Sequence, residues 1–183
     1  TEKPTEPEVP EEPVVEIVDL TTLNSKYEND FSKETTNFVT SGSATVEVVD
    51  GALKVTKTAQ WQGLKGVNFK FAKGMTYKFS FDLTVSKMGS TDYFELLFAD
   101  GTAEKVSHGL ATYVKVGETV KVEFYVTLLA DATEFLIGCW DGGAEYTIDN
   151  FVIENTVEPT EPEEPEIPEE KFEVIDLTQT GVK

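Results

Sequence analysis

The sequence predicts an all-β protein, an antiparallel β-sandwich of the jelly-roll type with extended Pro/Glu linkers at both ends. Polar and apolar residues alternate strictly in 77–85 and 120–126, which is the period of a strand with one buried face. Turn dipeptides such as Asp50-Gly51 and Lys73-Gly74 separate such stretches, and no stretch of helical period exceeds about two turns. About nine short strands at this spacing are typical of a sandwich.

The expected strands follow one another between these turns. In chain order they are 45–49, 52–57, 66–71, 77–85, 92–99, 110–116, 120–126, 134–140 and 145–154. A jelly roll arranges eight of them into two sheets. The first sheet is expected in the order 52–57, 145–154, 77–85 and 120–126. The second is expected in the order 66–71, 134–140, 92–99 and 110–116.

Alternation also assigns the two faces of the second sheet. The core is expected to take Phe94, Leu96, Phe98, Phe135, Ile137 and Cys139. The outward positions then gather Tyr93, Glu95, Trp140 and Asn68, and Trp61 precedes the first strand of this sheet. One outer face of the sandwich is therefore predicted to carry aromatic, acidic and amide side chains together.

Both ends of the chain differ in composition from the interior. Every proline lies near an end and recurs at every third residue, at Pro4, Pro7, Pro10 and Pro13 and again at Pro159, Pro162, Pro165 and Pro168. Polyproline II has about three residues per turn, and glutamate in the gaps stiffens the chain by like-charge repulsion. We interpret 1–13 and 156–171 as linkers and 14–155 as the folded module.

A short segment after each linker recurs. Glu16-Ile17-Val18-Asp19-Leu20-Thr21 follows the first linker, and Glu173-Val174-Ile175-Asp176-Leu177-Thr178 follows the second. The same linker-plus-strand unit therefore begins twice, and 172–183 is expected to be the start of a following repeat module. This organisation predicts a piece of a longer multimodular protein.

Composition excludes several classes of function. The net charge is −19, from 15 lysines and 34 acidic residues, which argues against a nucleic-acid partner and an anionic membrane surface. The single cysteine excludes an internal disulfide and a cysteine-built zinc site. No apolar run is long enough to cross a bilayer, so no membrane insertion is expected. A Ser-His-Asp triad would have to use the lone His108, and no nucleophile-elbow pattern occurs, so no enzyme is predicted.

Three segments make the interior resemble the carbohydrate-binding modules of families 4, 9 and 22, which are β-jelly rolls. The first is Asp30-Phe31 with the later Asp50-Gly51-Ala52-Leu53-Lys54-Val55. The second is Trp61-Gln62-Gly63-Leu64, and the third is Tyr146-Thr147-Ile148-Asp149-Asn150-Phe151-Val152-Ile153. The resemblance covers roughly 27–154. It implies a non-catalytic, secreted or cell-surface module of a bacterial polysaccharide-degrading protein.

The predicted ligand-binding residues are Trp61, Trp140, Tyr93, Glu95, Gln62 and Asn68. An indole or phenol ring is a flat, rigid, apolar platform for the C–H face of a sugar, and amides and carboxylates bind the hydroxyls. In the similar modules the tryptophan of the Trp-x-Gly segment lines the groove, and Trp61 matches that position. Gly138 faces the same side, where its missing side chain is expected to leave room for a ligand. Each aromatic residue has an ordinary alternative role as a cover of the sandwich edge.

The resemblance also implies a structural calcium ion. Its ligands in the similar modules match Asp149, Asp30 and Gly51 here, as one carboxylate and two backbone carbonyls, and oxygen ligands suit calcium. Asp149 is expected to be buried, where a carboxylate needs a counter-charge. The alternative is an aspartate that caps backbone amides where chains cross.

The sequence is compatible with two functions. The first is a monomeric module that binds single β-1,4-linked chains, xylan first and mixed-linkage glucan or mannan next, for an attached glycoside hydrolase. The second is a structural or adhesive repeat domain of a bacterial cell-surface protein, which the linker-strand recurrence fits equally well. Absence of any arginine leaves the glycan open, because the xylan-binding members of the family use a binding arginine.

Overall fold

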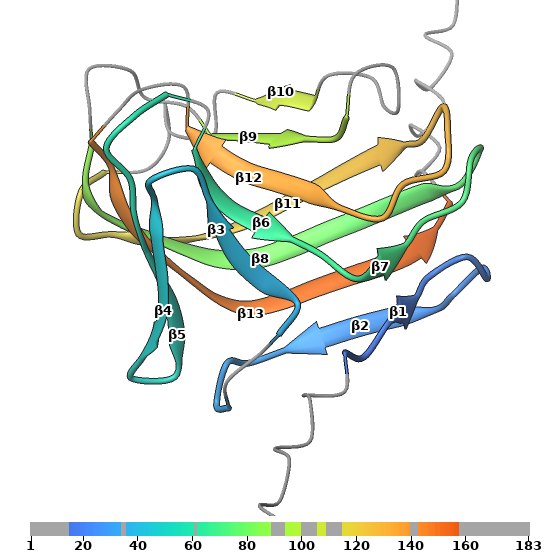
Figure 1. Ribbon diagram of the computed structural model, residues 1–183, viewed down its shortest axis with the longest axis horizontal. Coiled ribbons are helices and arrows are strands. Elements are labelled where there is room, and N and C mark those ends of the chain that lie inside the picture. Colours follow the sequence, from blue (N-terminus) through green and yellow to red (C-terminus); the bar gives the residue numbers. More distant parts are fainter. Residues whose placement is uncertain are drawn as a thin grey trace, which may run out of the picture.

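The computed structural model describes residues 15–33, 36–60, 62–88, 94–99, 106–108, 115–139 and 143–157. Within these ranges the chain forms 13 strands and no helix, which confirms the all-β prediction. Two large sheets pack face to face, and β12, β6 and β3 lie across β8 and β13 in Figure 1. Among the described residues, no helix has the length and apolarity that a bilayer crossing requires. The predicted linkers 1–13 and 156–171 and the repeat 172–183 lie almost wholly outside the described residues.

The six-stranded sheet runs in the order β11-β8-β13-β5-β4, and β2 pairs with β13 beside this path. Its strands are β2 (Lys26–Asn29), β4 (Thr45–Val49), β5 (Ala52–Thr56), β8 (Thr76–Lys87), β11 (Thr119–Thr127) and β13 (Glu145–Thr156). The predicted order of the first sheet is therefore confirmed, with β4 added at its edge. Long alternating strands specify this order well, because a slip of one residue would turn every apolar side chain to solvent.

The five-stranded sheet runs in the order β10-β9-β12-β6-β3. Its strands are β3 (Phe38–Ser41), β6 (Gly63–Gly66), β9 (Phe94–Leu97), β10 (Val106–His108) and β12 (Phe135–Cys139). The central neighbours β9 and β12 were predicted. The neighbour of β9 on its other side is β10, in a segment outside the expected strands, and most of the predicted strand 110–116 lies outside the described residues.

The predicted strand 66–71 was wrong as one element. It is divided between β6 and β7 (Phe69–Lys70), which pairs in parallel with β1 (Val18–Asp19) in a separate sheet. The break lies at Asn68, whose φ of 63° is in the left-handed region that asparagine tolerates better than most residues. The chain therefore leaves the five-stranded sheet after Gly66 and turns toward the N-terminal segment.

Aromatic side chains from both sheets fill the core. The ring of Phe135 on β12 lies with its centroid 5.2 Å from that of Phe79 on β8 and 6.0 Å from that of Phe151 on β13. Leu96, Phe135 and Ile137 are buried as the alternation predicted, and each such side chain contributes about 1.5–3 kcal/mol by burial. The outward Leu97 and Leu136 are half-buried. The apolar contact between the sheets thus fixes which face of the five-stranded sheet is left outside.

The core leaves no room for a side chain at Gly66, because a Cβ there would overlap the ring of Phe135. We expect Gly66→Ala to lower the free energy of unfolding by about 2–3 kcal/mol, as overpacking does. In a Phe135→Leu background the same change should cost about 1 kcal/mol less, because the smaller side chain yields. Chemical denaturation of the four proteins measures this coupling.

The exposed Val39 on the neighbouring strand supplies the control. Val39→Ala should change the free energy of unfolding by no more than about 0.5 kcal/mol in either background. If the costs of Gly66→Ala and Phe135→Leu simply add in the double variant, that result would contradict the packing of Gly66 against Phe135.

Candidate functional site

The pairing register aligns residues from five strands across the five-stranded sheet. Glu95 pairs with Gly138, Gly138 pairs with Gly63, and Gly63 pairs with Ser41. On the far side of Glu95, Ser107 of β10 completes the line. Gly63 and Gly138 therefore lie next to each other in the middle of this line. Leu64, Leu96 and Ile137 are buried on the opposite face of the sheet.

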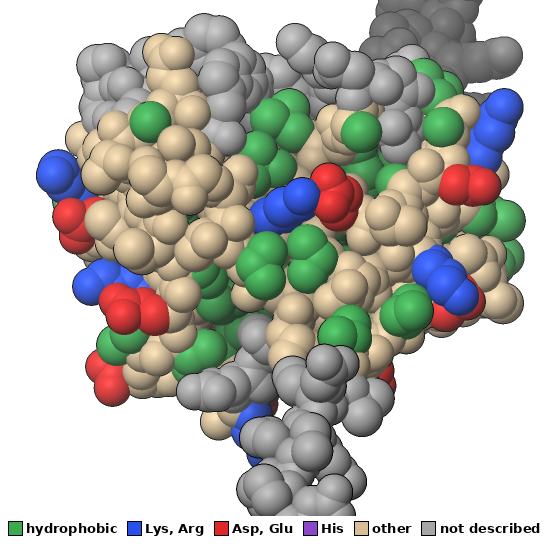
Figure 2. Space-filling model, in the orientation of Figure 1, with side chains coloured by type: hydrophobic (Ala, Val, Ile, Leu, Met, Phe, Trp, Pro, Cys, Tyr) green, Lys and Arg blue, Asp and Glu red, His purple; other side chains and the backbone are tan. Residues whose placement is uncertain are grey.

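A second line of outward residues lies next to the first. It consists of Leu97, Leu136, Lys65 and Val39, which are paired in that order. The Lys65 Nζ lies 2.8 Å from Oε2 of Glu134, and both side chains remain partly exposed. Figure 2 shows this side of the molecule, with hydrophobic side chains gathered around one touching pair of opposite charges where Figure 1 draws β6 and β12. The line is therefore mostly apolar, and its one cation is already paired.

Gln62 is held in place by the turn that follows β3. Its Oε1 accepts a hydrogen bond of 2.8 Å from the Ser43 hydroxyl, which lies 3.1 Å from the hydroxyl of Thr58. Gly42 has a φ of 65°, and a Cβ there would lie 2.6 Å from Nε2 of Gln62. The amide therefore lies directly against the backbone of the turn. Amide and hydroxyl groups grouped in this way are the partners that sugar hydroxyl groups need.

The space expected at Gly138 is not open. A Cβ at this position would lie 2.7 Å from the carbonyl oxygen of Gln62, and Gly138 is buried. The prediction that the glycine leaves room for a ligand was therefore wrong. The missing side chain instead lets the backbone before β6 approach β12 closely.

The three predicted aromatic residues Trp61, Tyr93 and Trp140 lie outside the described residues. The side chain of Glu95 does as well, although its strand is described. Their neighbours in sequence do converge, because Gly63 follows Gln62 and pairs with Gly138, which also pairs with Glu95. The roles of these four residues in binding stay predictions.

Asn68 lies apart from this group. β6 runs from Gly63, beside Gly138, to Gly66, beside Phe135, and Asn68 follows at that second end. Its carbonyl accepts a hydrogen bond of 2.9 Å from the amide of Val18. The structure therefore does not bring Asn68 together with Gln62 and Glu95, and its predicted binding role stays untested.

Asp149 is half-buried, and the expectation that it is buried was wrong. A β-bulge interrupts the pairing of β13 with β8 between Asp149 and Val152, and Asn150 has a φ of 49°. The carboxylate Oδ1 accepts a hydrogen bond of 2.6 Å from the backbone amide of Asn150. The capping role weighed for this aspartate is thus present, at a bulge that turns the side chain toward solvent.

The register nevertheless brings the three predicted calcium ligands to one gap in the sheet. On the edge of β13 opposite β8, β5 pairs with 145–148 and β2 pairs with 151–154. Gly51 directly precedes β5, Asp30 directly follows β2, and Asp149 lies on β13 between the two pairings. Asp30 and Asn150 also line a polar cavity of about 690 Å³. Two carbonyls and a carboxylate form an all-oxygen set of the type that calcium prefers.

The carboxylate of Asp30 has a different local role. It accepts a hydrogen bond of 3.0 Å from the backbone amide of Ser32, and this bond holds the pKa of Asp30 below its usual value. Within the described ranges, no three His, Cys, Asp or Glu side chains come together as a metal site. A cation at the gap would therefore depend on backbone carbonyls as much as on carboxylates.

Some residues beside this face were not predicted. Val39 and Ser41 belong to β3, and Ser43 and Thr58 hold Gln62. The signal for β3 was a short run of apolar and β-branched residues, 38–41, directly before Gly42. Nothing in the sequence connects Ser43 and Thr58 to Gln62, because that contact depends on the path of two loops.

Comparison with solved structures identifies the fold. A family 22 xylan-binding domain from Paenibacillus barcinonensis Xyn10C superposes with a TM-score of 0.55 at 16% identity, over 76% of this chain and 99% of that domain. A second family 22 xylan-binding domain gives 0.54 at 19% identity, over 73% and 96%. The Clostridium thermocellum xylanase 10B fragment, a family 22 module joined to its family 10 hydrolase module and complexed with xylohexaose, gives 0.54 at 15% identity, over 72% and 28%.

These identities are low, and the likeness is one of fold. The chain has the jelly-roll fold found in carbohydrate-binding modules, as the resemblance implied. No protein-family model matches the sequence, and no curated protein matches it.

The contact between Gly138 and Gln62 can be tested by stability. We expect Gly138→Ala to lower the free energy of unfolding by about 1–3 kcal/mol, because the new methyl group must displace the Gln62 carbonyl. Ser41→Ala removes a hydroxyl from the same line without adding an atom, and it should cost no more than about 0.5 kcal/mol. Equal costs for the two changes, measured by denaturant unfolding, would contradict the close approach described at Gly138.

Proposed function

We propose that the chain is a non-catalytic carbohydrate-binding module. It binds β-1,4-linked plant polysaccharide in an open groove over the five-stranded sheet, xylan first and mixed-linkage glucan or mannan next. The observation that carries the proposal is the pairing register that aligns Gly63, Gly138 and Glu95, with Gln62 directly before Gly63. The aromatic positions 61, 93 and 140 each lie within two residues of this group in sequence.

The chemistry of the ligand follows from this set of residues. Indole and phenol rings offer flat apolar surfaces on which the C–H face of a pyranose ring stacks. The amide of Gln62 and the neighbouring hydroxyls of Ser43 and Thr58 supply donors and acceptors for sugar hydroxyls. The one cation of the adjacent line, Lys65, is paired with Glu134, which favours a neutral ligand over an anionic one.

The similar structures support the same class of ligand. Two of them are xylan-binding domains, and a third is a module joined to a family 10 hydrolase module with xylohexaose bound. We extend these properties to this chain and propose that it targets an attached glycoside hydrolase in a secreted or cell-surface bacterial protein. A stiff Pro/Glu spacer then raises the effective concentration of polysaccharide for the attached module.

The affinity should be modest. A flexible polysaccharide loses conformational freedom on binding, and stacking of a few rings gains only a few kcal/mol. Because this loss offsets much of the gain from stacking, we expect a dissociation constant of about tens of micromolar. The module acts as a monomer in this proposal, since one chain supplies the whole face.

Affinity electrophoresis in gels that contain xylan, β-glucan, mannan or starch tests the proposal. We expect retardation in xylan above all, and we expect Trp61→Ala and Trp140→Ala each to abolish it, because each change removes a stacking surface. Tyr125→Ala is the matched control, since Tyr125 is an aromatic residue of β11 in the other sheet and should leave retardation unchanged.

Tryptophan fluorescence on addition of xylo-oligosaccharide gives an independent reading. A shift that disappears in the tryptophan variants supports the proposed face. Unretarded migration in all four gels together with an unchanged emission spectrum would contradict the proposal, and would favour a structural or adhesive repeat.

We further propose that calcium binds at the gap occupied by Asp149, with the carbonyls of Asp30 and Gly51. Asp149→Asn separates this role from amide capping, because an asparagine oxygen still accepts the Asn150 hydrogen bond but carries no charge. Thermal unfolding in calcium and in a chelator should differ by several degrees for the parent protein and not for the variant. Identical melting temperatures of the parent protein in the two conditions would contradict a calcium site.

A further inference from the structure

The first copy of the recurring segment, 16–21, is bound in a defined slot of this fold. The two copies share Glu, Asp, Leu and Thr at the same four positions, and the two central apolar residues exchange isoleucine and valine. The contacts of the first copy show what each position does. They involve β7, the preceding turn and the end of β13.

Backbone groups provide the first set of contacts. The amide of Val18 donates to the carbonyl of Asn68 at 2.9 Å, and the amide of Leu20 donates to the carbonyl of Lys70 at 3.0 Å. The carbonyl of Glu16 accepts a hydrogen bond of 3.3 Å from the side chain of Asn37. Any segment of suitable conformation can make these bonds, because no side chain of the bound segment takes part in them.

Leu20 anchors the segment in the core. Its side chain is 1% exposed, and its carbonyl accepts a hydrogen bond of 2.8 Å from the Asn155 amide near the end of β13. Asn155 itself is completely buried. Loss of this leucine from the slot would leave a cavity in the core and a buried amide donor without its acceptor.

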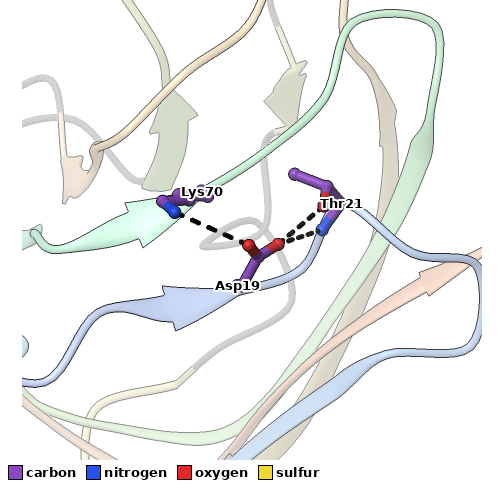
Figure 3. Close-up of polar contacts among 3 residues, drawn as sticks. All are labelled: Asp19, Thr21 and Lys70. Carbon is purple, nitrogen blue, oxygen red and sulfur yellow. Dashed lines mark hydrogen bonds and ion pairs between the residues drawn. The ribbon is translucent and has the colours of Figure 1, made fainter.

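Asp19 shapes the chain at the end of the slot. Its Oδ1 accepts hydrogen bonds from the Thr21 amide at 3.1 Å and from the Thr21 hydroxyl at 2.6 Å, and its Oδ2 lies 3.7 Å from the Lys70 Nζ (Figure 3). The bonds from Thr21 come first among the causes that lower the pKa of Asp19. Aspartate and threonine two residues apart therefore stabilise this bend.

Every one of these contacts can be made by the second copy. Asp176, Leu177 and Thr178 repeat the three side chains that matter, and the remaining bonds use backbone groups. Ile17 is 57% exposed, so valine in its place loses little. Isoleucine in place of Val18 adds one methylene group at a position that is only partly buried.

We propose that the slot beside β7 accepts either copy. In a protein of residues 1–183, without the following module that the sequence predicts, 173–178 then docks in the slot of a second molecule. The sequence of the spacer favours a second molecule over the same one, because proline at every third residue and seven glutamates over 156–171 predict an extended chain. This exchange does not rest on the proposed function. It makes the recurring segment a connector that links molecules head to tail.

In the parent chain, the first copy occupies the slot in preference to the second copy. Only residues 22–25 separate it from β2, so its effective concentration at the slot is high, and the parent protein stays monomeric. A change that weakens the first copy should shift the balance toward exchange. Because the slot and the connector are different parts of the chain, the contact is heterologous, and it builds open chains unless the rotation closes into a ring.

The test is a double-mutant cycle at the two leucines, with mass measured by analytical ultracentrifugation over a range of protein concentrations. We expect Leu20→Asn to give a mass that rises with concentration, and Leu177→Asn alone to change nothing. Leu20→Asn combined with Leu177→Asn should be monomeric and should unfold more easily than Leu20→Asn alone. A monomeric Leu20→Asn protein would overturn the proposal, and so would assembly that persists in the double variant.

Cross-linking tests the register of the same contact. Lys70 is the register partner of Asp19, so a protein with Leu20→Asn and Lys70→Cys, whose own first copy is weakened, should form a disulfide-linked heterodimer with an Asp176→Cys protein when the two are mixed and oxidised. Thr180→Cys, four residues further along, is the matched control and should link at least tenfold less. Equal yields from Asp176→Cys and Thr180→Cys would overturn the proposed register.

Discussion

The pairing of β13 is the constraint on which the rest of this fold depends. β8 pairs with one edge of β13 over nearly its whole length, and β5 and β2 share the other edge. Its inward residues, Tyr146, Ile148, Phe151 and Ile153, are buried against the facing sheet. Near its end, Asn155 holds the N-terminal segment by the carbonyl of Leu20. One strand thus fixes the six-stranded sheet, the core and the start of the module.

The candidate binding face follows from that arrangement. Aromatic residues of β8 and β13 pack against Phe135, and this contact leaves the opposite face of β12 outside. The glycines at 63 and 138 then let the chain before β6 approach β12 closely, which brings Gln62 to the same end of the sheet as Glu95. A face built this way offers polar groups beside an apolar line, Leu97, Leu136, Lys65 and Val39. That mixture matches the two kinds of surface that a sugar presents.

The sequence predicted the parts of the fold that long alternation specifies. The order of four strands of the six-stranded sheet and the inward positions of Leu96, Phe135 and Ile137 were correct, because side chains alternate along a strand and one face must be apolar. The side chains of Phe94 and Cys139 lie outside the described residues. The short strands β3 and β10 were not predicted, because three or four residues carry little periodic signal. The break at Asn68 depends on a single left-handed residue, and the exposure of Asp149 depends on a bulge. Contacts between loops, such as that of Ser43 with Gln62, depend on the completed fold.

A titration with xylohexaose, followed by the amide signals of the isotopically labelled protein, tests the central claim most directly. If a β-1,4-linked chain lies across the five-stranded sheet, the amides of Gln62, Gly63 and 136–138 should shift together and saturate at one stoichiometry. The amides of β11, in the other sheet, should not move. Shifts confined to the six-stranded sheet, or no shift at millimolar oligosaccharide, would contradict the account.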